Sequence, residues 1–535
     1  FGEFMNGTDR DLIDVDVNEK IVAHEMMHHW FGDLVTCESW SNLTLNEGFA
    51  NYSEYMWTEH KHGKELADFH KLNEKESYLS SLTYNMHPLI HYGYNDKEDM
   101  FDAHSYNKGG LVLHMLRYLV GDEAFFASCK RYLEDNAYTE VEIDELRLAF
   151  EDVTGKDLNW FFDQWFLSSG QPTLNISKSF DSANNELTVK LRQTHSNEEM
   201  PSIFQLPVDF EVVYNDGSKE VFKRFLNKRE DLFVFNVKAK PALIIFDPEN
   251  TLLAIKHFDK KDEEYLFQLK HASSFEHRFI AFQKLIKSGP YKAEAINLAL
   301  NDRVWVTRKL ALEQLDTAAL LSSVYEMAKN DAHSEVRSAA LSTLIRMNDK
   351  NSVDLAEHII KNDKSYNVIS AAIDYLSFTN SPRSAEIAAS LENSDSDRLL
   401  LSVGNIYLKN ETTDKLSFFM EAMDRFSSYE LVDFLQVYTN LLILGNSDQI
   451  EEGAGVLLKI SLDDNSDFLS KIASTYALNN LYFNLFGLGK IDNPDLSQKE
   501  AASMGAELKL KMLEIKEKEK DPVLQDYYSQ FPVFN

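Results

Sequence analysis

Short segments of similar pattern recur along the C-terminal half of the chain and restrict it to a stacked helical fold. The segments begin at Arg278, Arg308, Arg337, Ile369 and Leu401. Successive starts lie 30, 29, 32 and 32 residues apart. A repeat of this length holds one pair of helices, and each pair buries its apolar face only against the next pair. The pattern therefore predicts an α-solenoid over residues 257–535, in which packing explains the recurring arginines.

The period of the hydrophobic pattern is two upstream of the repeats. Between residues 171 and 256, apolar and polar residues alternate, for example in "ELTVKLRQ" and "KEVFKRFL". Asn215-Asp216-Gly217, between two such runs, is typical of a hairpin turn. Several short strands in one stretch of this length predict a small β-sandwich.

Residues 1–170 show helical periodicity instead. We expect a first helix over residues 21–31, with Asp16 and Glu19 spaced as a capping box and Gly32 as a stop signal. Further helices are expected at 44–63, 107–120, after Asp122 and at 142–155. The whole chain is therefore predicted to be multidomain and mainly α: a helical unit (1–170), a β-sandwich (171–256) and a helical repeat domain (257–535).

Composition limits the classes of partner. The formal net charge is −32, which disfavours nucleic acid and anionic lipid surfaces because their phosphates would be repelled. A solvated acidic surface explains this charge, and attraction of cationic groups such as free amino termini is the alternative. Cys37 and Cys129 are too few for a disulfide framework or a Cys-rich metal site. No apolar run approaches the roughly 18 residues of a transmembrane helix. We expect a soluble chain, cytoplasmic or periplasmic.

The segment "HEMMH", His24 to His28, carries the clearest chemistry. Residues four apart lie on one face of a helix, so both imidazoles can reach one ion. Zinc suits nitrogen and oxygen ligands, and a catalytic zinc keeps three protein ligands and one position for water. Glu25 adjoins His24 and can reach that water without occupying the metal. We therefore expect one zinc ion per chain, with Glu25 as the general base.

The third ligand decides between a metal site and a helix that merely bears two surface histidines. Glu47 follows His28 after eighteen intervening residues, which is enough for a loop and a second helix to return its carboxylate. In a competing interpretation, Thr44 and Glu47 form a capping box at the start of that helix. His29 lies off the face shared by the two motif histidines, so we expect a neighbour rather than a ligand. The predicted ligands are His24, His28 and Glu47.

The stretch "IVAHEMMHHWFGDLVTCESWSNLTLNEGFANYSEYMW" resembles the active-site region of the M1 zinc aminopeptidases, a gluzincin family. "FDAHSYNKGG" (101–110) is similar to the Y-x-K-G segment of that family. The resemblance implies that Tyr106 is catalytic and donates a hydrogen bond to the oxyanion of the tetrahedral intermediate. Lys108 belongs to the same pattern without an assigned role, and a solvated side chain is expected. The resemblance also implies a thermolysin-like catalytic unit, a β-sandwich and a HEAT-like solenoid, in that order.

One motif of the family has no counterpart here. The family carries G-x-M-E-N upstream of H-E-x-x-H, and its glutamate binds the free α-amino group of the substrate. Only 23 residues precede His24, and none of them match. We therefore expect an upstream N-terminal portion of the same protein to be a partner of this chain.

The resemblance favours hydrolysis of N-terminal residues from peptides by zinc-activated water. One alternative is a zinc endopeptidase or an epoxide hydrolase on the same scaffold. Another is a non-catalytic M1-like interaction scaffold, which the complete set of predicted site residues disfavours.

Overall fold

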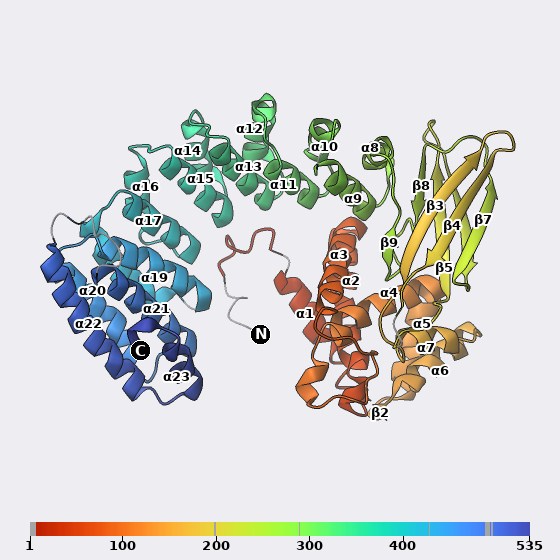
Figure 1. Cartoon of the computed structure of the whole chain (residues 1–535), viewed down its shortest axis with the longest axis horizontal. Coiled ribbons are helices and arrows are strands. Elements are labelled where there is room, and N and C mark those ends of the chain that lie inside the picture. Colours follow the sequence, from red (N-terminus) through yellow and green to blue (C-terminus); the bar gives the residue numbers. More distant parts are fainter. Residues whose placement is uncertain are drawn as a thin grey trace. The chain divides into compact units, whose positions relative to one another are not determined.

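The computed structural model describes residues 7–15, 17–196, 199–287, 289–426, 428–486, 493 and 496–534. The chain is mainly helical, with strands between two helical regions (Figure 1). It divides into two compact units, Asp16–Gln314 and Leu315–Asn535, the second of which includes Phe1–Val15. The predicted limits at residues 170 and 256 fall where helices give way to strands and strands to helices, and the division into three domains stays a prediction.

The first unit begins with four helices that carry most of the predicted site. They are α1 (Val17–Met27), α2 (Thr44–His62), α3 (Lys64–Ser81) and α4 (Gly109–Val120). Helix α2 matches the predicted span 44–63 and ends at Gly63, whose φ of 89° favours glycine. His60, Lys61 and His62 lie in its last turn, where positive charge complements the helix dipole.

Helix α1 ends four residues earlier than predicted, at Met27 rather than Phe31. The chain then turns, and Asp33 N–H donates to the His28 carbonyl at 2.8 Å. Asp16 lies outside the described residues. The capping box predicted for Asp16 and Glu19 therefore stays a prediction. The Glu19 carboxylate accepts from Trp57, Lys61 and His62 of α2, so it also joins α1 to that helix.

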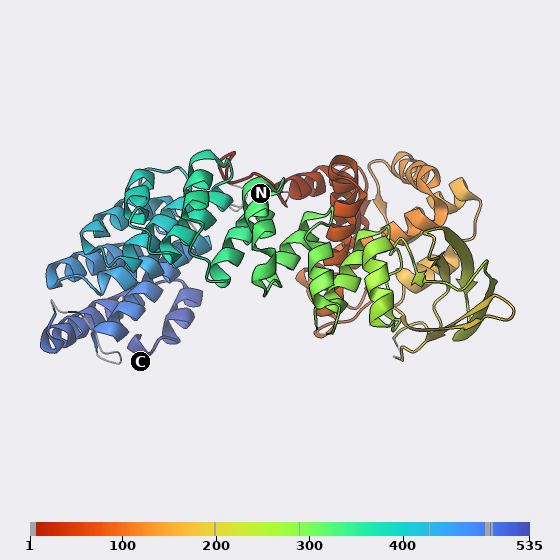
Figure 2. The same ribbon diagram turned by 90° about the horizontal axis from the view of Figure 1, so that it is seen from above.

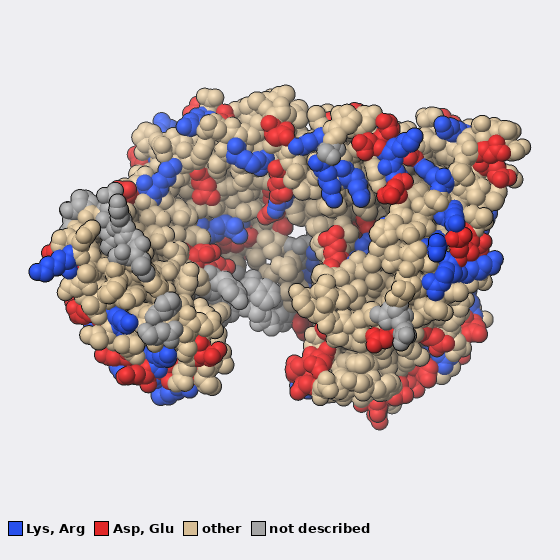
Figure 3. Space-filling model, in the orientation of Figure 1, with Lys and Arg blue, Asp and Glu red and all other residues tan. Residues whose placement is uncertain are grey.

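Smaller elements complete the helical part. A π-helix at His104–Lys108 leads directly into α4, so the predicted helix 107–120 begins in a different geometry. Cys37 and Cys129 are free thiols. Figure 3 shows acidic side chains at the lower right of the visible face. Glu134, Asp144 and Asp152, in the helices that follow α4, are exposed. The remaining elements are α5 (Asp122–Asp135), α6 (Ile143–Thr154), α7 (Asn159–Trp165), and short β1 (Thr36–Cys37) and β2 (Glu140–Val141).

Two sheets follow the helices. The first has the strand order β7-β4-β3-β9 and the second β6-β5-β8. Phe210 of the second sheet contacts Phe233 and Phe235 of the first, with ring centroids 5.7 and 5.3 Å apart. Gly217, with φ 79°, turns the chain in the predicted hairpin. The strands are β3 (Thr173–Asp181), β4 (Glu186–Gln193), β5 (Leu206–Val213), β6 (Lys219–Leu226), β7 (Glu230–Asn236), β8 (Leu243–Phe246) and β9 (Ile255–His257).

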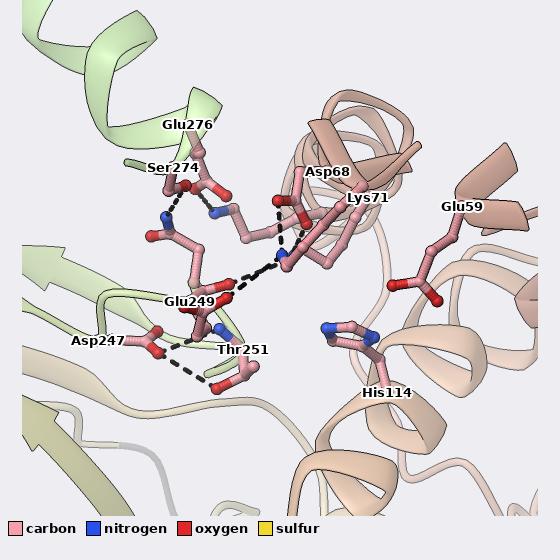
Figure 4. A network of polar contacts seen from close by, with 12 residues as sticks. Glu59, Asp68, Lys71, His114, Asp247, Glu249, Thr251, Ser274 and Glu276 are labelled. Carbon is pink, nitrogen blue, oxygen red and sulfur yellow. Dashed lines mark hydrogen bonds and ion pairs between the residues drawn. The ribbon is translucent and has the colours of Figure 1, made fainter. Parts of the chain in front are cut away.

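A buried polar network joins α3 to the loop after β8 and to the first repeat helices (Figure 4). The Lys71 ammonium donates to Asp68 at 2.9 Å and to the Glu249 carbonyl at 3.3 Å. Lys75, one turn further along α3, pairs with Glu276 of α9 (Phe275–Leu285). These contacts fix α3 at both its sheet side and its repeat side. The first unit ends with α8 (Asp262–His271), α9, α10 (Lys292–Ala299) and α11 (Trp305–Glu313).

The second unit consists of further helices, many of them in successive pairs (Figure 2). Helices α13 (Ser334–Arg346), α15 (Tyr366–Phe378) and α17 (Asp397–Lys409) pack side by side and hold the repeated segments. The others are α12 (Leu321–Asn330), α14 (Val353–Asn362), α16 (Ser384–Leu391), α18 (Leu416–Ala422), α19 (Ser428–Leu442), α20 (Ser447–Leu462), α21 (Phe468–Leu485), α22 (Gln498–Lys518) and α23 (Pro522–Ser529).

Residues 7–15 pack on this second unit and supply acceptors to three repeat helices. The Asp14 carboxylate accepts from Ser334 N–H at 2.6 Å, and the Arg10 carbonyl accepts from Tyr366 N–H at 3.2 Å. Asp11 accepts from the Ser396 hydroxyl at 2.7 Å, immediately before α17. The first N–H groups of a helix have no partner within it, so this segment satisfies donors that would otherwise need water.

Two of the repeated arginines form ion pairs that recur with the repeat. Arg278 binds Asp302 through two hydrogen bonds of 2.8 and 3.2 Å. Arg337 binds Asp363 in the same way, at 2.8 and 3.0 Å. Each arginine also donates to backbone carbonyls at the start of its helix. These contacts give the two arginines the structural role that the repeat pattern predicts.

We predict that Arg337→Met destabilises the C-terminal unit. The side chains of Arg337 and Asp363 are only 13% and 10% exposed, so removal of the cation leaves a buried carboxylate unpaired. We expect the free energy of unfolding to fall by about 3 kcal/mol, measured by urea unfolding, with faster hydrogen exchange in α13 and α15. Arg398→Met is the control, since Arg398 is exposed on α17. Equal stability of the two variants would contradict the structural role of Arg337.

Candidate metal centre

Three side chains from two helices converge on one point. His24 comes from α1, His28 follows the last residue of that helix, and Glu47 comes from the first turn of α2. Glu47 Oε2 lies 3.3 Å from His24 Nε2 and 3.3 Å from His28 Nε2. One ligand atom from each residue lies within 4.8 Å of the other two. The contact between α1 and α2 therefore brings the three predicted ligands together.

The spacing of these atoms fits a tetrahedral metal centre. Zinc binds nitrogen and oxygen at about 2.0–2.1 Å, and two ligands at the tetrahedral angle then lie about 3.3 Å apart. Both histidine–glutamate distances have this value. Glu47 Oε2 is also buried without a donor in hydrogen-bonding geometry. A buried carboxylate oxygen in this state is explained when a cation takes the place of the donor.

The remaining nitrogen of each imidazole is already engaged. His24 Nδ1 donates to Glu54 at 2.9 Å, and His28 Nδ1 donates to the Phe31 carbonyl at 3.2 Å. In neutral imidazoles this arrangement places the lone pair on Nε2, the atom that faces Glu47. Glu54 was not identified from the sequence. Its position seven residues after Glu47, two turns along the same helix, is the signal that points to it.

The local charges favour a cation at this point. Burial alone would lower the pKa of His24, but its contact with the Glu47 carboxylate and its hydrogen bond to Glu54 raise it to about 9. Burial would raise the pKa of Glu47, but its contacts with the two histidines lower it to about 2. Two carboxylates thus stabilise positive charge between the imidazoles, which is the electrostatic requirement of a divalent metal.

The two predicted catalytic residues differ in their surroundings. Tyr106 stacks on His24 with ring centroids 5.9 Å apart and an interplanar angle of 7°. Burial and the nearby Glu47 carboxylate raise the pKa of its phenol, so the hydroxyl stays protonated and can donate. Glu25 is exposed and lies next to His24 on α1. The structure places Tyr106 beside the cluster and leaves Glu25 open to solvent. His29 is also exposed and pairs with Asp33, outside the cluster.

A second group of two histidines and one carboxylate lies at the start of the π-helix, which begins at His104. Asp102 accepts from His87 at 2.9 Å and from His104 at 2.8 Å. Its other oxygen accepts from the backbone N–H groups of His104 and Ser105. These are ordinary hydrogen-bond lengths, shorter than the ligand spacing of a tetrahedral zinc site. We interpret this group as a polar support for the turn that carries Tyr106, and the sequence analysis missed it.

One expectation for the neighbouring residues was wrong, and the competing interpretation of Thr44 is contradicted. Lys108 is not solvated: its side chain is fully buried, lies over the Tyr78 ring at 5.8 Å, and burial lowers its pKa to about 7. Thr44 does not form a capping box with Glu47, because its hydroxyl donates to the Ser105 carbonyl at 3.0 Å. In both cases packing against another segment decides the environment of the side chain.

Two parts of the chain are similar in sequence to known protein families. Residues 8–165 match the model of the peptidase family M1 domain, and residues 321–404 match HEAT repeats. Glutamyl aminopeptidase of Bitis rhinoceros is 33% identical over 165 residues, which are 29% of this chain and 17% of that protein. Tricorn protease-interacting factor F2 of Thermoplasma acidophilum is 29% identical over 248 residues, which are 45% of this chain and 30% of that protein.

A solved structure has a similar overall fold. Aminopeptidase A of Legionella pneumophila, crystallised with aspartic acid, aligns over 95% of this chain and 67% of that chain with a TM-score of 0.57 and 15% identity. Residues 8–165 are thus similar to the peptidase family M1 domain, and residues 321–404 to HEAT repeats. It spans less than a third of the length of the curated relatives described above. Among the described residues, no helix combines the length and apolarity needed to cross a bilayer.

We predict that His24→Ala and Glu47→Ala each abolish stoichiometric zinc binding. Each variant removes one of three protein ligands, and two ligands hold zinc far more weakly. Zinc content after dialysis, measured by plasma mass spectrometry, checks this expectation. His29→Ala is the matched control, since this histidine is exposed and pairs with Asp33. Retention of zinc by His24→Ala would remove this residue from the site.

Proposed function

We propose that the chain forms the catalytic part of an M1-type zinc aminopeptidase, a metallopeptidase that removes N-terminal residues from peptides. The observation that carries the proposal is the spacing of His24, His28 and Glu47, at the distances that tetrahedral zinc requires. The stacking of Tyr106 beside this cluster supports it. The names of the relatives, which include aminopeptidases from several organisms, support the same class of reaction.

Each residue of the proposed site would have its own role in the reaction. His24, His28 and Glu47 would hold one zinc ion, and Glu54 would orient the His24 ring through Nδ1. When bound, zinc supplies a polarised water molecule with a lowered pKa. Glu25 would take the proton of the attacking water and pass it to the leaving amine. The Tyr106 hydroxyl would donate a hydrogen bond to the oxyanion that forms on the substrate carbonyl.

The preference for free amino termini rests on the relatives, since the glutamate that binds the α-amino group has no counterpart here. A zinc endopeptidase or an epoxide hydrolase would use the same ligands. Fluorogenic aminoacyl substrates with free and with acetylated amino groups separate these possibilities when the intact protein that contains this chain is assayed. Cleavage of acetylated substrates at comparable rates would favour an endopeptidase.

We predict that Glu25→Gln retains zinc and loses peptide hydrolysis. The amide cannot accept the proton of the attacking water, and removal of a general base lowers turnover by roughly 10²–10⁴-fold. Release of the free aminoacyl fluorophore, with zinc content as the control, checks this. Activity within twofold of the parent would exclude Glu25 as the base, and a chelator that left the parent fully active would exclude zinc catalysis.

We predict that Tyr106→Phe lowers kcat much more than it changes KM. The phenol interacts with charge that develops in the transition state, and loss of one such donor lowers kcat by about 10²–10³-fold. Steady-state kinetics on a free aminoacyl substrate measures both constants. An unchanged kcat would show that Tyr106 does not contact the reacting carbonyl.

A further inference from the structure

Tyr106 lies in a backbone geometry that needs support from its surroundings. It is the central residue of the π-helix His104–Lys108, in which Lys108 N–H donates to the Ala103 carbonyl at 2.9 Å. Single π-turns are rare, are less stable than α-helix and occur mostly at functional sites. The question is therefore which contacts hold this turn.

The residue before Tyr106 is held by α2. The Thr44 hydroxyl donates to the Ser105 carbonyl at 3.0 Å, and both residues are buried. Thr44 stands three residues before Glu47, on the same face of the helix. Helix α2, which carries the predicted ligand Glu47, therefore also binds the backbone of Ser105, the residue before Tyr106.

The residue after Tyr106 is held by α3. The Asn107 amide donates to Glu74 Oε2 at 2.8 Å. The same oxygen accepts from Asn51 at 2.7 Å, and Asn51 stands four residues after Glu47 on α2. One carboxylate thus connects the turn to α2. Helix α3 itself is held by Lys71, in the network of Figure 4, and by the ion pair of Lys75 with Glu276.

The start of α4, directly after the π-helix, packs closely against α2. A Cβ on Gly109 would lie 2.4 Å from the Thr44 hydroxyl and 2.9 Å from Gly48 Cα. A Cβ on Gly110 would lie 2.3 Å from Asn51 Oδ1. The backbones of α2 and α4 are therefore in close contact at this point. This contact keeps constant the distances over which Thr44 and Asn51 make their hydrogen bonds.

We propose that Thr44 and Glu74 are positioning residues for Tyr106. Thr44 fixes the backbone before the tyrosine and Glu74, through Asn107, the residue after it. Together they hold the phenol at a set distance from the ligand carboxylate of Glu47, which lies on the same α2 face as Thr44 and Asn51. The catalytic consequence rests on the function proposed above, whereas the geometric consequence does not.

Thr44→Val and Thr44→Ser test the contact before Tyr106. Valine keeps the shape and removes the donor, whereas serine keeps the hydroxyl. We expect kcat to fall about tenfold in Thr44→Val with KM and zinc content unchanged, and to stay within twofold in Thr44→Ser. In a Tyr106→Phe background, Thr44→Val should cause no further loss. An equal loss in both backgrounds would overturn the proposal, because a purely structural role predicts it.

The contact after Tyr106 is tested by exchanging the two polar groups. Asn107→Asp places a second carboxylate against Glu74 and should lower kcat about tenfold or more. Adding Glu74→Gln supplies an amide donor to Asp at position 107 and should restore most of the activity. Glu76→Gln is the matched control, since Glu76 is exposed on the same helix. Failure of the double variant to recover, with folding intact, would overturn the role of Glu74.

A spectroscopic measurement separates this proposal from the proposed function. In protein labelled with 3-fluorotyrosine, the ¹⁹F resonance of Tyr106 is the one lost in Tyr106→Phe. We expect this resonance to shift or broaden in Thr44→Val and Asn107→Asp and to return in the exchanged double variant. An unchanged resonance would overturn the proposal. A shifted resonance in a protein without peptidase activity would retain the positioning role and refute only the proposed function.

Discussion

The packing of α1 against α2 is the interaction on which the candidate site depends. Two imidazoles from the end of α1 each lie 3.3 Å from one carboxylate at the start of α2, although eighteen residues separate His28 from Glu47 in the chain. Burial of these three groups costs free energy unless positive charge compensates the carboxylate. The 3.3 Å spacing and the charge at this point are both explained by one divalent cation.

One face of α2 contacts several other parts of the site. Thr44, Glu47, Gly48 and Asn51 recur at helical spacing and meet, in order, the turn before Tyr106, the two histidines, the glycines of α4 and the carboxylate of Glu74. Glu54, one turn beyond Asn51, orients His24. The predicted metal ligand Glu47 therefore lies on the same helix as Thr44 and Asn51, which contact Ser105 and Glu74, and this helix keeps their separation constant.

Two clusters of similar composition are distinguished by distance. His24, His28 and Glu47 stand at ligand spacing, whereas His87, Asp102 and His104 stand at hydrogen-bond spacing. Asp102 has four donors, and Glu47 Oε2 has none in hydrogen-bonding geometry. Composition alone would not separate these groups, and the hydrogen bonds of Asp102 favour the first group as the metal site.

The sequence by itself determined the local patterns: the repeated helices, the alternating strands, the span of α2 and the residue types of the ligand set. Each of these follows from neighbours in the chain, because helix and strand periodicities are local. Only the tertiary structure decided that α1 ends at Met27, that Lys108 is buried, that Thr44 holds Ser105, and that Glu54 and Glu74 face the site. These outcomes depend on which segment packs opposite each side chain, and that partner lies many residues away in the sequence.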